Sequence, residues 1–482
     1  MEAGLPDSPR LSRRGPAPAP GIVHLGPGAF FRAFNAVYTE DAMAASGGDW
    51  GIVAVSLRSA TARDQLEPQG GAYTSISLMP EGPRARVIGS IVEVLVAPED
   101  PGAVLDRMTD PSTRIVSLTI TEKGYCHFPS SGELDPEHPD ILHDLAEPDS
   151  PRSALGFLVE ALARRRATGQ GPFTVLSCDN LPSNGHLARR VVIAMARLRD
   201  EELADWIERE VPFPATMVDR ITPATTEDVV ARLEETEGYR DPACVQHEPF
   251  KQWVIEDRFV AGRPDWAAAG AQMVRDVEAH ETMKLRCLNG THSTLAYLGY
   301  LARHETIADA VADPPFARLC EKLWAEEIVP TVPQPEGEDL ARYTAALMER
   351  YRNPQIRHLT WQIAMDGSQK LPQRILGTVR DARSAGRVPA GLCLAVAAWM
   401  RYVGGMDERG QPIDVRDPMA DRLKCASDGA ESAADKVDAL LGFREIFGID
   451  LAGDAAFREA VVDAYETLQE KGAQRAVEAY VA

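Results

Sequence analysis

The sequence has few cysteines, and they are scattered. Its seven cysteines among 482 residues form no Cys-x-x-Cys pair. An odd, dispersed set argues against a disulfide framework and against a structural zinc site, so we expect no metal ligand cluster. Cys287, one turn beyond Lys284 in the stretch discussed below, is interpreted as a small buried side chain and not as a nucleophile.

Long apolar runs are also missing. The longest, residues 388–403, is too short to cross a membrane and ends near Arg401, so it predicts a buried helix. The first twenty residues carry Arg10, Arg13 and Arg14 but no apolar segment of the kind a signal peptide needs. We therefore expect residues 1–20 to form a disordered tail.

Positive charge is in the minority. The formal net charge is −21, which argues against a nucleic acid or an anionic membrane as partner. The length predicts two or three domains with sizeable cores. Together these features are typical of an acidic cytoplasmic enzyme that acts on a small molecule.

Short apolar runs alternate with amphipathic stretches over the first half of the chain. Candidate strands lie at 21–25, 51–57, 114–120, 173–177, 216–219 and 250–256, and candidate helices at 33–45, 153–166 and 186–199. This alternation predicts an α/β fold with a doubly wound parallel sheet, in which ligands bind outside the carboxyl ends of the strands. We expect a Rossmann-like dinucleotide-binding domain over residues 21–275.

From about residue 275 the pattern is almost entirely helical. Helices are predicted at 272–304, 306–328, 338–351, 354–365, 390–404, 431–443 and 454–481. Residues 276–482 are therefore expected to form a mainly α-helical substrate-binding domain. The junction between two domains is a favoured place for a ligand.

A glycine turn follows the first candidate strand. Strand, glycine turn and helix is the arrangement that places a pyrophosphate on a helix N-terminus. Gly26 would make the tight turn, and Gly28 would let the backbone approach the phosphates. The third glycine of the usual fingerprint is missing, and Phe31 or Arg32 stands near its place. Arg32 could add charge to the phosphates or lie on the surface.

The end of the second candidate strand leaves the choice of dinucleotide open. NAD-binding domains place a ribose-binding acid there, but this chain has Arg58, Ser59 and Thr61, with no acid before Asp64. An arginine and hydroxyls could instead hold a 2′-phosphate. NAD and NADP both remain candidates on local chemistry.

Polar residues also follow the later strands. Glu122, Asn180 and Asp219 each lie where a strand ends, which is the ligand edge of such a sheet. The alternative for Asp179 and Asn180 is turn chemistry, which both residue types favour.

The stretch Glu281–His292 carries the most chemistry. On a straight α-helix with Lys284 at zero, Glu281 falls near ~60°, His292 near ~80° and Asn289 near ~140°. A lysine on such a partly buried face is a candidate general base, and the Asn289 amide could donate to a developing alkoxide. The alternative is a solvated Glu281–Lys284 pair and a core histidine. Lys284 and His292 would lie ~12 Å apart along the axis, so a shared ligand requires a bend, for example near Gly290.

Five motifs in order resemble the polyol-specific long-chain dehydrogenase/reductase family, the mannitol 2-dehydrogenase and fructuronate reductase group. They are residues 26–33 (Gly-Pro-Gly-Ala-Phe-Phe-Arg-Ala), 119–125 (Thr-Ile-Thr-Glu-Lys-Gly-Tyr), 177–180 (Ser-Cys-Asp-Asn), 217–223 (Met-Val-Asp-Arg-Ile-Thr-Pro) and Lys284-x4-Asn289-x2-His292. The resemblance runs from about Gly21 to the C-terminus.

The resemblance implies a metal-independent NAD-dependent polyol dehydrogenase with a lysine acid–base. Lys284 would be the general base, Asn180 and Asn289 would hold the reacting oxygen, and His292 would orient the substrate. Asp219 would bind substrate hydroxyls, and Glu281 or Glu122 would relay the proton. The implied cofactor-binding residues are Gly26, Gly28, Phe30, Phe31, Arg32 and Arg58. The family tends towards monomers, so a monomer or weak oligomer is expected.

Two segments of the helical half bear on the substrate. Residues 353–358 (Asn-Pro-Gln-Ile-Arg-His) and 361–374 resemble the mannitol branch more than the fructuronate branch, and Arg357, His358 and Lys370 are candidate contacts to the far end of the sugar. The predicted pair is D-mannitol and D-fructose. The same cations could bind a hexuronate carboxylate, so fructuronate reduction stays open, as do arabinitol and sorbitol. A non-catalytic dinucleotide-binding protein is the alternative from another class.

Overall fold

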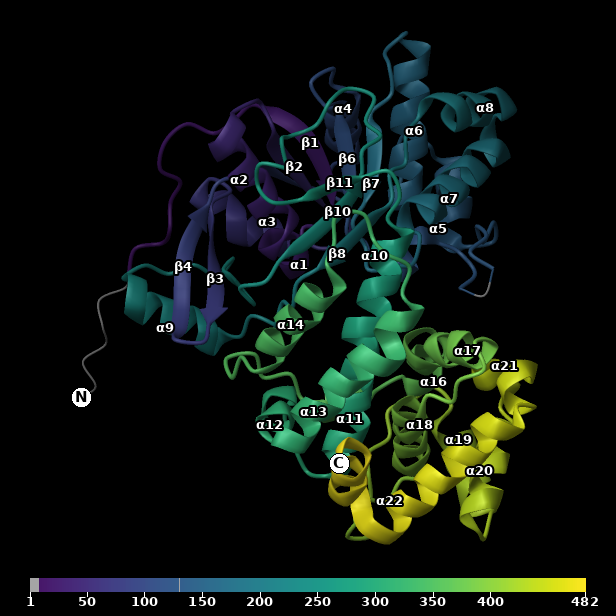
Figure 1. The fold of residues 1–482 in the computed structure, drawn as a ribbon. Helices are drawn as coiled ribbons and strands as arrows, with labels where there is room; N and C mark the ends of the chain where they lie inside the picture. Colours follow the sequence, from purple (N-terminus) through teal and green to yellow (C-terminus); the bar gives the residue numbers. More distant parts are fainter. Residues whose placement is uncertain (1–7, 130) are drawn as a thin grey trace. The chain divides into compact units, whose positions relative to one another are not determined.

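The computed structural model describes residues 8–129 and 131–482. The chain divides into two compact units, Met1–Glu278 and Ala279–Ala482 (Figure 1). We call them the sheet unit and the helical unit. The division lies close to the boundary near residue 275 that the change of pattern predicts.

A five-stranded parallel sheet forms the centre of the sheet unit (Figure 1). Its order is β5-β2-β1-β6-β7, with strands at Pro20–Leu25 (β1), Gly51–Ser56 (β2), Ile91–Val96 (β5), Ile115–Leu118 (β6) and Thr174–Ser177 (β7). The sheet grows outward from β1 in both directions, as in a doubly wound fold. The predicted Rossmann-like sheet is therefore confirmed.

Burial explains why these segments form central strands. Every residue of β2, β6 and β7 is buried. A parallel sheet is covered on both faces, so its strands are apolar nearly throughout and not in alternation. Neighbouring strands pair in register, with Val23 of β1 opposite Val53 of β2 and Val116 of β6.

Two three-stranded sheets complete this unit. In one, the antiparallel hairpin of β3 (Tyr73–Met79) and β4 (Gly82–Ile88) pairs with β9 (Val245–His247). In the other, β10 (Gln252–Glu256) pairs antiparallel to β8 (Thr216–Asp219) and parallel to β11 (Gln272–Val274). The strands predicted near 216 and 250 exist, and they lie in this separate sheet and not in the five-stranded parallel one.

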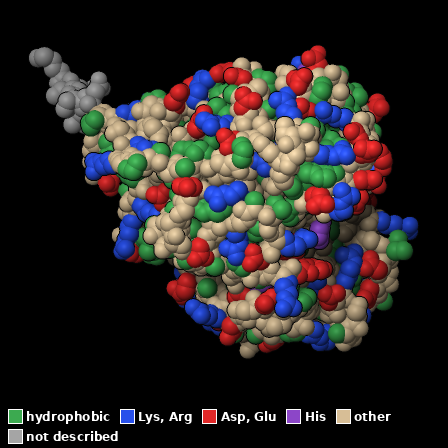
Figure 2. All heavy atoms as spheres, turned by 90° about the horizontal axis from the view of Figure 1, so that it is seen from above, with side chains coloured by type: hydrophobic (Ala, Val, Ile, Leu, Met, Phe, Trp, Pro, Cys, Tyr) green, Lys and Arg blue, Asp and Glu red, His purple; other side chains and the backbone are tan. Residues whose placement is uncertain are grey.

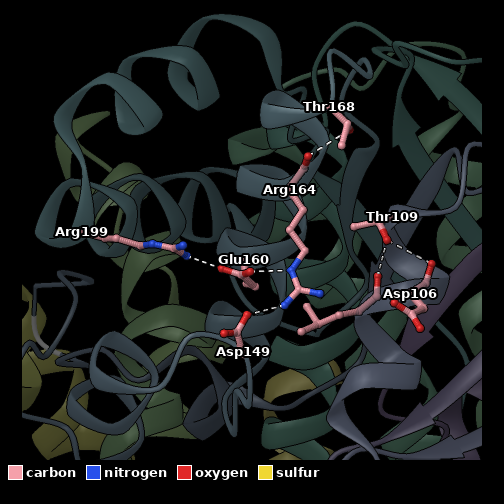
Figure 3. Close-up of polar contacts among 8 residues, drawn as sticks. Asp106, Thr109, Asp149, Glu160, Arg164, Thr168 and Arg199 are labelled. Carbon is pink, nitrogen blue, oxygen red and sulfur yellow. Dashed lines mark hydrogen bonds and ion pairs between the residues drawn. The ribbon is translucent and has the colours of Figure 1, made fainter.

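Helices pack against one another around the central sheet. Those of this unit are α1 (Ala29–Ala33), α2 (Asn35–Ser46), α3 (Thr61–Leu66), α4 (Pro101–Thr109), α5 (Pro139–Ala146), α6 (Ala154–Ala167), α7 (Asn184–Arg199), α8 (Glu201–Glu210) and α9 (Glu227–Glu237), with short 3-10 turns at Glu67–Gln69 and Glu122–Tyr125. Figure 3 shows how α6 and α7 are joined: the buried carboxylate of Glu160 accepts from Arg164 at 2.6 Å and from Arg199 at 2.5 Å. A buried carboxylate needs such partners to offset its desolvation.

The segment before β1 is attached to the sheet unit. Leu11 is buried, and the Arg13 guanidinium donates to the carbonyl oxygens of Gly70, Gly89 and Ile91. The prediction of a disordered tail is therefore wrong for residues 8–20, and residues 1–7 lie outside the described part. Arginine can satisfy several carbonyls at once, and sequence spacing gave no sign of those partners.

The helical unit is built around two buried helices, α11 (Thr291–Leu301) and α18 (Ala390–Val403). Its other helices are α10 (Glu278–Met283), α12 (Ile307–Ala312), α13 (Pro314–Lys322), α14 (Leu340–Tyr351), α15 (Thr360–Ile363), α16 (Gly367–Leu371), α17 (Gly377–Ser384), α19 (Ala420–Asp428), α20 (Ala433–Leu441), α21 (Arg444–Ala452) and α22 (Ala455–Val481). Three π-helical segments interrupt them, η3 (Lys284–Gly290), η4 (Leu323–Ile328) and η6 (Pro372–Leu376), and η5 (Val329–Thr331) is a 3-10 turn. The predicted mainly helical fold of this half is confirmed.

Two helix predictions need correction. The helix expected over 272–304 begins only at Glu278, because residues 272–274 pair with β10 as a strand. The helix expected over 354–365 is reduced to Thr360–Ile363, since the preceding stretch forms turns. Pairing with another segment overrides local helix propensity in the first case.

The surface carries both signs of charge. Acidic and basic side chains are interspersed over the face seen in Figure 2, with small apolar groups between them. Within the described residues, no helix is both long enough and apolar enough to span a membrane.

We predict that Arg13→Ala lowers the free energy of unfolding by about 2 kcal/mol, because three carbonyl acceptors lose their donor and each such bond contributes about 0.5–1.5 kcal/mol net. Urea unfolding measures this. Arg14→Ala is the matched control, since Arg14 is exposed and should change stability by less than about 0.5 kcal/mol. Equal effects of the two changes would contradict the attachment by Arg13.

Candidate functional site

The glycine turn after β1 is held by close backbone contacts. Gly26 has φ +95°, and a Cβ there would lie 2.2 Å from the carbonyl oxygen of Thr119. The Thr119 hydroxyl donates to the carbonyl of Gly26 at 2.7 Å. Only glycine can occupy this position, both for its left-handed conformation and for the absence of a side chain. The predicted role of Gly26 in a tight turn agrees with this geometry.

Arg32 and Phe31 support the turn from the protein side. The Arg32 guanidinium donates to the carbonyl of Pro27 at 2.8 Å and is buried, which lowers its pKa. Phe31 is 1% exposed and stacks on His24 at 3.6 Å. Phe30 stacks on Phe34 at 5.1 Å. Of these predicted cofactor residues, Arg32 borders the cavity described next, whereas Phe30 and Phe31 do not.

A cavity of about 400 Å³ opens at the carboxyl ends of β1, β2 and β6. It lies where the strand order reverses, which is the ligand position in doubly wound folds. Gly28 borders it, and a Cβ on Gly28 would have no protein atom closer than 4.0 Å. A side chain there would project into space that a ligand could use. The lining includes Gly26, Pro27, Gly28, Ser56, Leu57, Arg58, Ser59, Thr61, Thr119, Thr121, Lys123 and Gly124.

The end of the cavity next to β2 is lined by the arginine and the hydroxyl residues that follow this strand in the sequence. Arg58, Ser59 and Thr61 line it, and Asp64 does not. Asp64 instead accepts from Arg63 at 2.9 Å on the surface. Arg58 therefore lines this cavity, and its contact with a cofactor stays a prediction.

The turn after β6 is fixed by Asp179, whose role sequence reasoning missed. Its buried carboxylate accepts from the backbone N–H groups of Ile120 and Thr121 and from the Tyr125 hydroxyl, at 2.8–3.1 Å. Burial raises the pKa of Asp179, and these hydrogen bonds oppose that rise. Thr121 has φ +64°, a strained conformation for a β-branched residue that needs such support. Asp179 thus shapes one wall of the cavity.

Three other predicted residues lie at strand ends of the sheet unit. Asn180 follows β7 and is exposed, and Asp219 ends β8 and is buried. Glu122 is exposed and does not border the cavity, unlike its neighbours Thr121 and Lys123.

The lysine stretch differs from the straight α-helix that we expected. Lys284–Gly290 is π-helical, and α10 and α11 continue it on either side. In a π-helix hydrogen bonds join residues five apart, and single π-turns recur at functional sites. Lys284 and Asn289 are five residues apart, so they lie one π-turn from each other. The expected offset of ~140° between them, which assumes α geometry, is wrong.

Gly290 is the contact point between this π-helix and another. A Cβ on Gly290 would lie 2.7 Å from the carbonyl oxygen of Arg374 in η6. Any larger residue would push the two segments apart. A π-turn that ends at this glycine stands at the position where a ligand shared by Lys284 and His292 would require a bend in an α-helix.

His292 follows on α11 in an aromatic and cationic environment. Its ring is 6% exposed, stacks on Tyr351 at 4.8 Å and meets His358 edge-on at 5.0 Å. Burial first, and then the neighbouring basic groups of His358, Arg350 and Arg374, hold its pKa well below the usual range. Burial also lowers the pKa of His358 to about 4. Both rings are therefore neutral near pH 7 and can exchange hydrogen bonds with hydroxyl groups.

The remaining predicted substrate contacts, Lys370, Arg357 and His358, differ in their surroundings. Lys370 is partly buried, donates to the carbonyl of Met365 at 2.6 Å, and has a pKa lowered by burial and by Arg374. Arg357 is 70% exposed and pairs with Glu305 at 2.7 Å. The structure thus brings His358 together with His292, whereas Arg357 lies in a surface ion pair. Arg374, which sequence reasoning passed over, acts on both His292 and Lys370.

Among residues 8–129 and 131–482, no three His, Cys, Asp or Glu side chains converge as a metal site would require. Within the helical unit, the candidate groups are the Lys284 amine, the Asn289 amide and the imidazoles of His292 and His358. Such a set can move a proton and hold hydroxyl groups.

Comparison with known proteins agrees with this division of the chain. Residues 20–268 match the mannitol dehydrogenase Rossmann domain, and residues 276–469 match the mannitol dehydrogenase C-terminal domain. The chain belongs to the mannitol dehydrogenase family. The predicted enzyme class, a polyol dehydrogenase, is confirmed at the level of the family.

Relatives of this mannitol dehydrogenase family member cover nearly its whole length. A D-mannonate oxidoreductase from Escherichia coli is 49% identical over 463 residues, which cover 95% of each chain. A solved Pseudomonas fluorescens mannitol 2-dehydrogenase, a ternary complex with NAD and D-mannitol, is 38% identical with a TM-score of 0.80, covering 96% of this chain and 94% of that one. A substrate-free D-sorbitol dehydrogenase is 34% identical with a TM-score of 0.90, covering 98% of each.

We predict opposite outcomes for alanine at the two glycines of the turn. Gly26→Ala should destabilise the sheet unit by about 2 kcal/mol or more, because its Cβ meets a carbonyl and its φ is strained. Gly28→Ala, the matched control, should leave thermal unfolding almost unchanged and weaken dinucleotide binding at least tenfold, because its methyl group enters the cavity. Unfolding scans and dinucleotide titration measure both. Normal dinucleotide affinity in Gly28→Ala would contradict the assignment of the cavity.

Proposed function

We propose that this protein is an NAD-dependent oxidoreductase that interconverts a secondary alcohol of an open-chain polyol and the matching ketose. The observation that carries the proposal is the stretch from Lys284 to His292, whose π-turn puts an amine and an amide one turn apart. The cavity beside Gly28 and the 38% identity to a mannitol 2-dehydrogenase solved with NAD and D-mannitol support the cofactor.

The residues present fit a dinucleotide. The Gly26–Gly28 turn would take the pyrophosphate, and Ser59, Thr61 and Arg58 would face the adenosine ribose. When bound, the nicotinamide supplies the acceptor for hydride. Arg58 would also tolerate a 2′-phosphate, so NADP is the second cofactor to compare.

The proposed acid–base group, Lys284, belongs to the helical unit. Lys284 takes the alcohol proton during oxidation and returns it during ketone reduction. The Asn289 amide, one π-turn along, donates to the oxygen that gains negative charge, with Asn180 as the second donor. His292, neutral because burial lowers its pKa, orients a neighbouring hydroxyl, and Asp219 binds another. Glu281 passes the proton on towards water.

D-mannitol and D-fructose are the pair predicted from the sequence motifs. D-mannonate and its 5-keto acid, D-fructuronate, are the second candidate pair, favoured by the higher identity to the D-mannonate oxidoreductase, 49% against 38%. Both reactions use the same hydride and proton steps, so the catalytic assignment does not depend on the choice.

Nicotinamide absorbance followed over a panel of alcohols tests this function. D-mannitol, D-mannonate, D-sorbitol and D-arabinitol should each be tried with NAD and with NADP. We expect turnover of at least one six-carbon substrate with NAD. No turnover of any of them would contradict the proposed function and favour a non-catalytic dinucleotide-binding protein.

We predict that Lys284→Ala lowers kcat by about 10²–10⁴-fold, the usual contribution of a general base. Dinucleotide affinity and thermal unfolding should stay near those of the parent protein, as fluorescence titration and circular dichroism would show. Lys424→Ala is the control, because Lys424 is an exposed lysine paired with Asp428 and should keep full activity. A kcat within threefold of the parent for Lys284→Ala would contradict the role of the amine.

A further inference from the structure

Arg374 is a partly buried cation without a matching anion. Among the described residues no ion pair joins it to a carboxylate, and its guanidinium donates a hydrogen bond to the Ser293 hydroxyl at 3.3 Å. Burial lowers its pKa, and the groups that counter this are the hydroxyls of Tyr297 and Tyr351, not an acid. Desolvating a guanidinium is costly unless an anion compensates.

The backbone places this cation beside the catalytic stretch. The Arg374 carbonyl is packed against Gly290, where a Cβ would come within 2.7 Å. Its guanidinium reaches Ser293, three residues further along the same helix. Arg374 therefore runs along the segment that connects Asn289 to His292. The π-turn of η6 and the absence of a side chain at Gly290 both contribute to this approach.

Basic side chains lie around Arg374. Lys370 lies four residues earlier on the same helical segment and has its pKa lowered by Arg374. His292 has its pKa lowered by His358, Arg350 and Arg374 together. The acids near Lys370 are Asp366, at 4.0 Å, and Asp417, which accepts from Ser368. The Arg374 guanidinium donates to the Ser293 hydroxyl and keeps further N–H donors for a bidentate anion.

We propose that Arg374 binds the carboxylate of a polyhydroxy acid and so makes an aldonate, rather than a neutral polyol, the preferred substrate. This inference rests on the proposed alcohol–ketone reaction and names its substrate class. A guanidinium matches a carboxylate in a two-bond geometry that a terminal CH₂OH group cannot copy. The compensating anion would then arrive with the substrate, which explains why the cation lacks a partner within the protein.

D-mannonate and D-mannitol form a matched pair for the test, since they differ in a terminal carboxylate against a terminal CH₂OH. The parent enzyme should prefer D-mannonate at least tenfold in kcat/KM. Arg374→Gln should lower kcat/KM for D-mannonate at least 100-fold, mainly through KM, and change that for D-mannitol less than threefold. Arg374→Lys, which keeps the charge but loses the fork, should lose about tenfold on D-mannonate alone.

Arg422→Gln controls for the charge change, because Arg422 is an exposed arginine paired with Glu445. It should leave both substrates within twofold of the parent. Parallel losses on both substrates in Arg374→Gln and Arg374→Lys would overturn the inference and leave Arg374 as a structural brace on Ser293. A parent enzyme that turns over D-mannitol but prefers it to D-mannonate would overturn the inference and leave the proposed reaction standing. Absence of turnover with either substrate and either dinucleotide would overturn both.

Discussion

The close contact at Gly290 is the constraint on which the catalytic stretch of the helical unit depends. A carbonyl of η6 lies against the bare backbone of Gly290, at the end of the π-turn that begins at Lys284. A π-turn is less favourable than an α-helix and persists where packing fixes it. We infer that this contact fixes the geometry of Lys284 and Asn289, because it stabilises a π-turn that aligns two side chains which an α-helix would turn away from each other.

The rest of the helical unit can be understood from this contact. Beyond it, α11 is buried along nearly its whole length, which fixes the direction of His292. Tyr351 donates to the carbonyl of Leu288 at 3.0 Å and bonds to the Thr291 hydroxyl at 2.7 Å, so the end of the π-turn is tied to α14. These links hold the backbone in place, and they leave the Lys284 amine on a partly exposed side chain. In the sheet unit, Gly26 and Asp179 perform the comparable task of fixing the loops around the cavity.

The sequence was most informative where a segment is apolar throughout or carries a glycine that marks a turn. Continuous apolar runs identified β1, β2, β6 and β7, and Gly26 marked the turn that follows β1. It was least informative where tertiary contacts decide the local structure. β4 (Gly82–Ile88) carries arginines and is largely exposed, so it lacks the pattern of a buried strand and owes its strand form to pairing with β3. The tail through Arg13 looked disordered because its carbonyl acceptors lie more than fifty residues away.

For the candidate site, too, the sequence revealed some residues, whereas tertiary contacts decided the rest. Spacing alone brought Lys284, Asn289 and His292 to attention, but on α-helical geometry, which could not reveal the π-turn. Asp179 was passed over as turn chemistry because its backbone partners belong to the loop after β6. Arg374 escaped notice because a cation becomes informative only when its burial and its lack of an acidic partner are known. The family resemblance predicted the roles of the site residues, and the structure showed which contacts hold those residues in place.

The most direct test of the central claim is a crystal structure with NAD and a slowly reacting substrate analogue bound. We predict that the Lys284 Nζ and the Asn289 amide lie within about 3 Å of the oxygen on the reacting carbon, with the π-turn intact. A bound analogue whose reacting oxygen is contacted by neither group, with the amine directed into solvent, would contradict it.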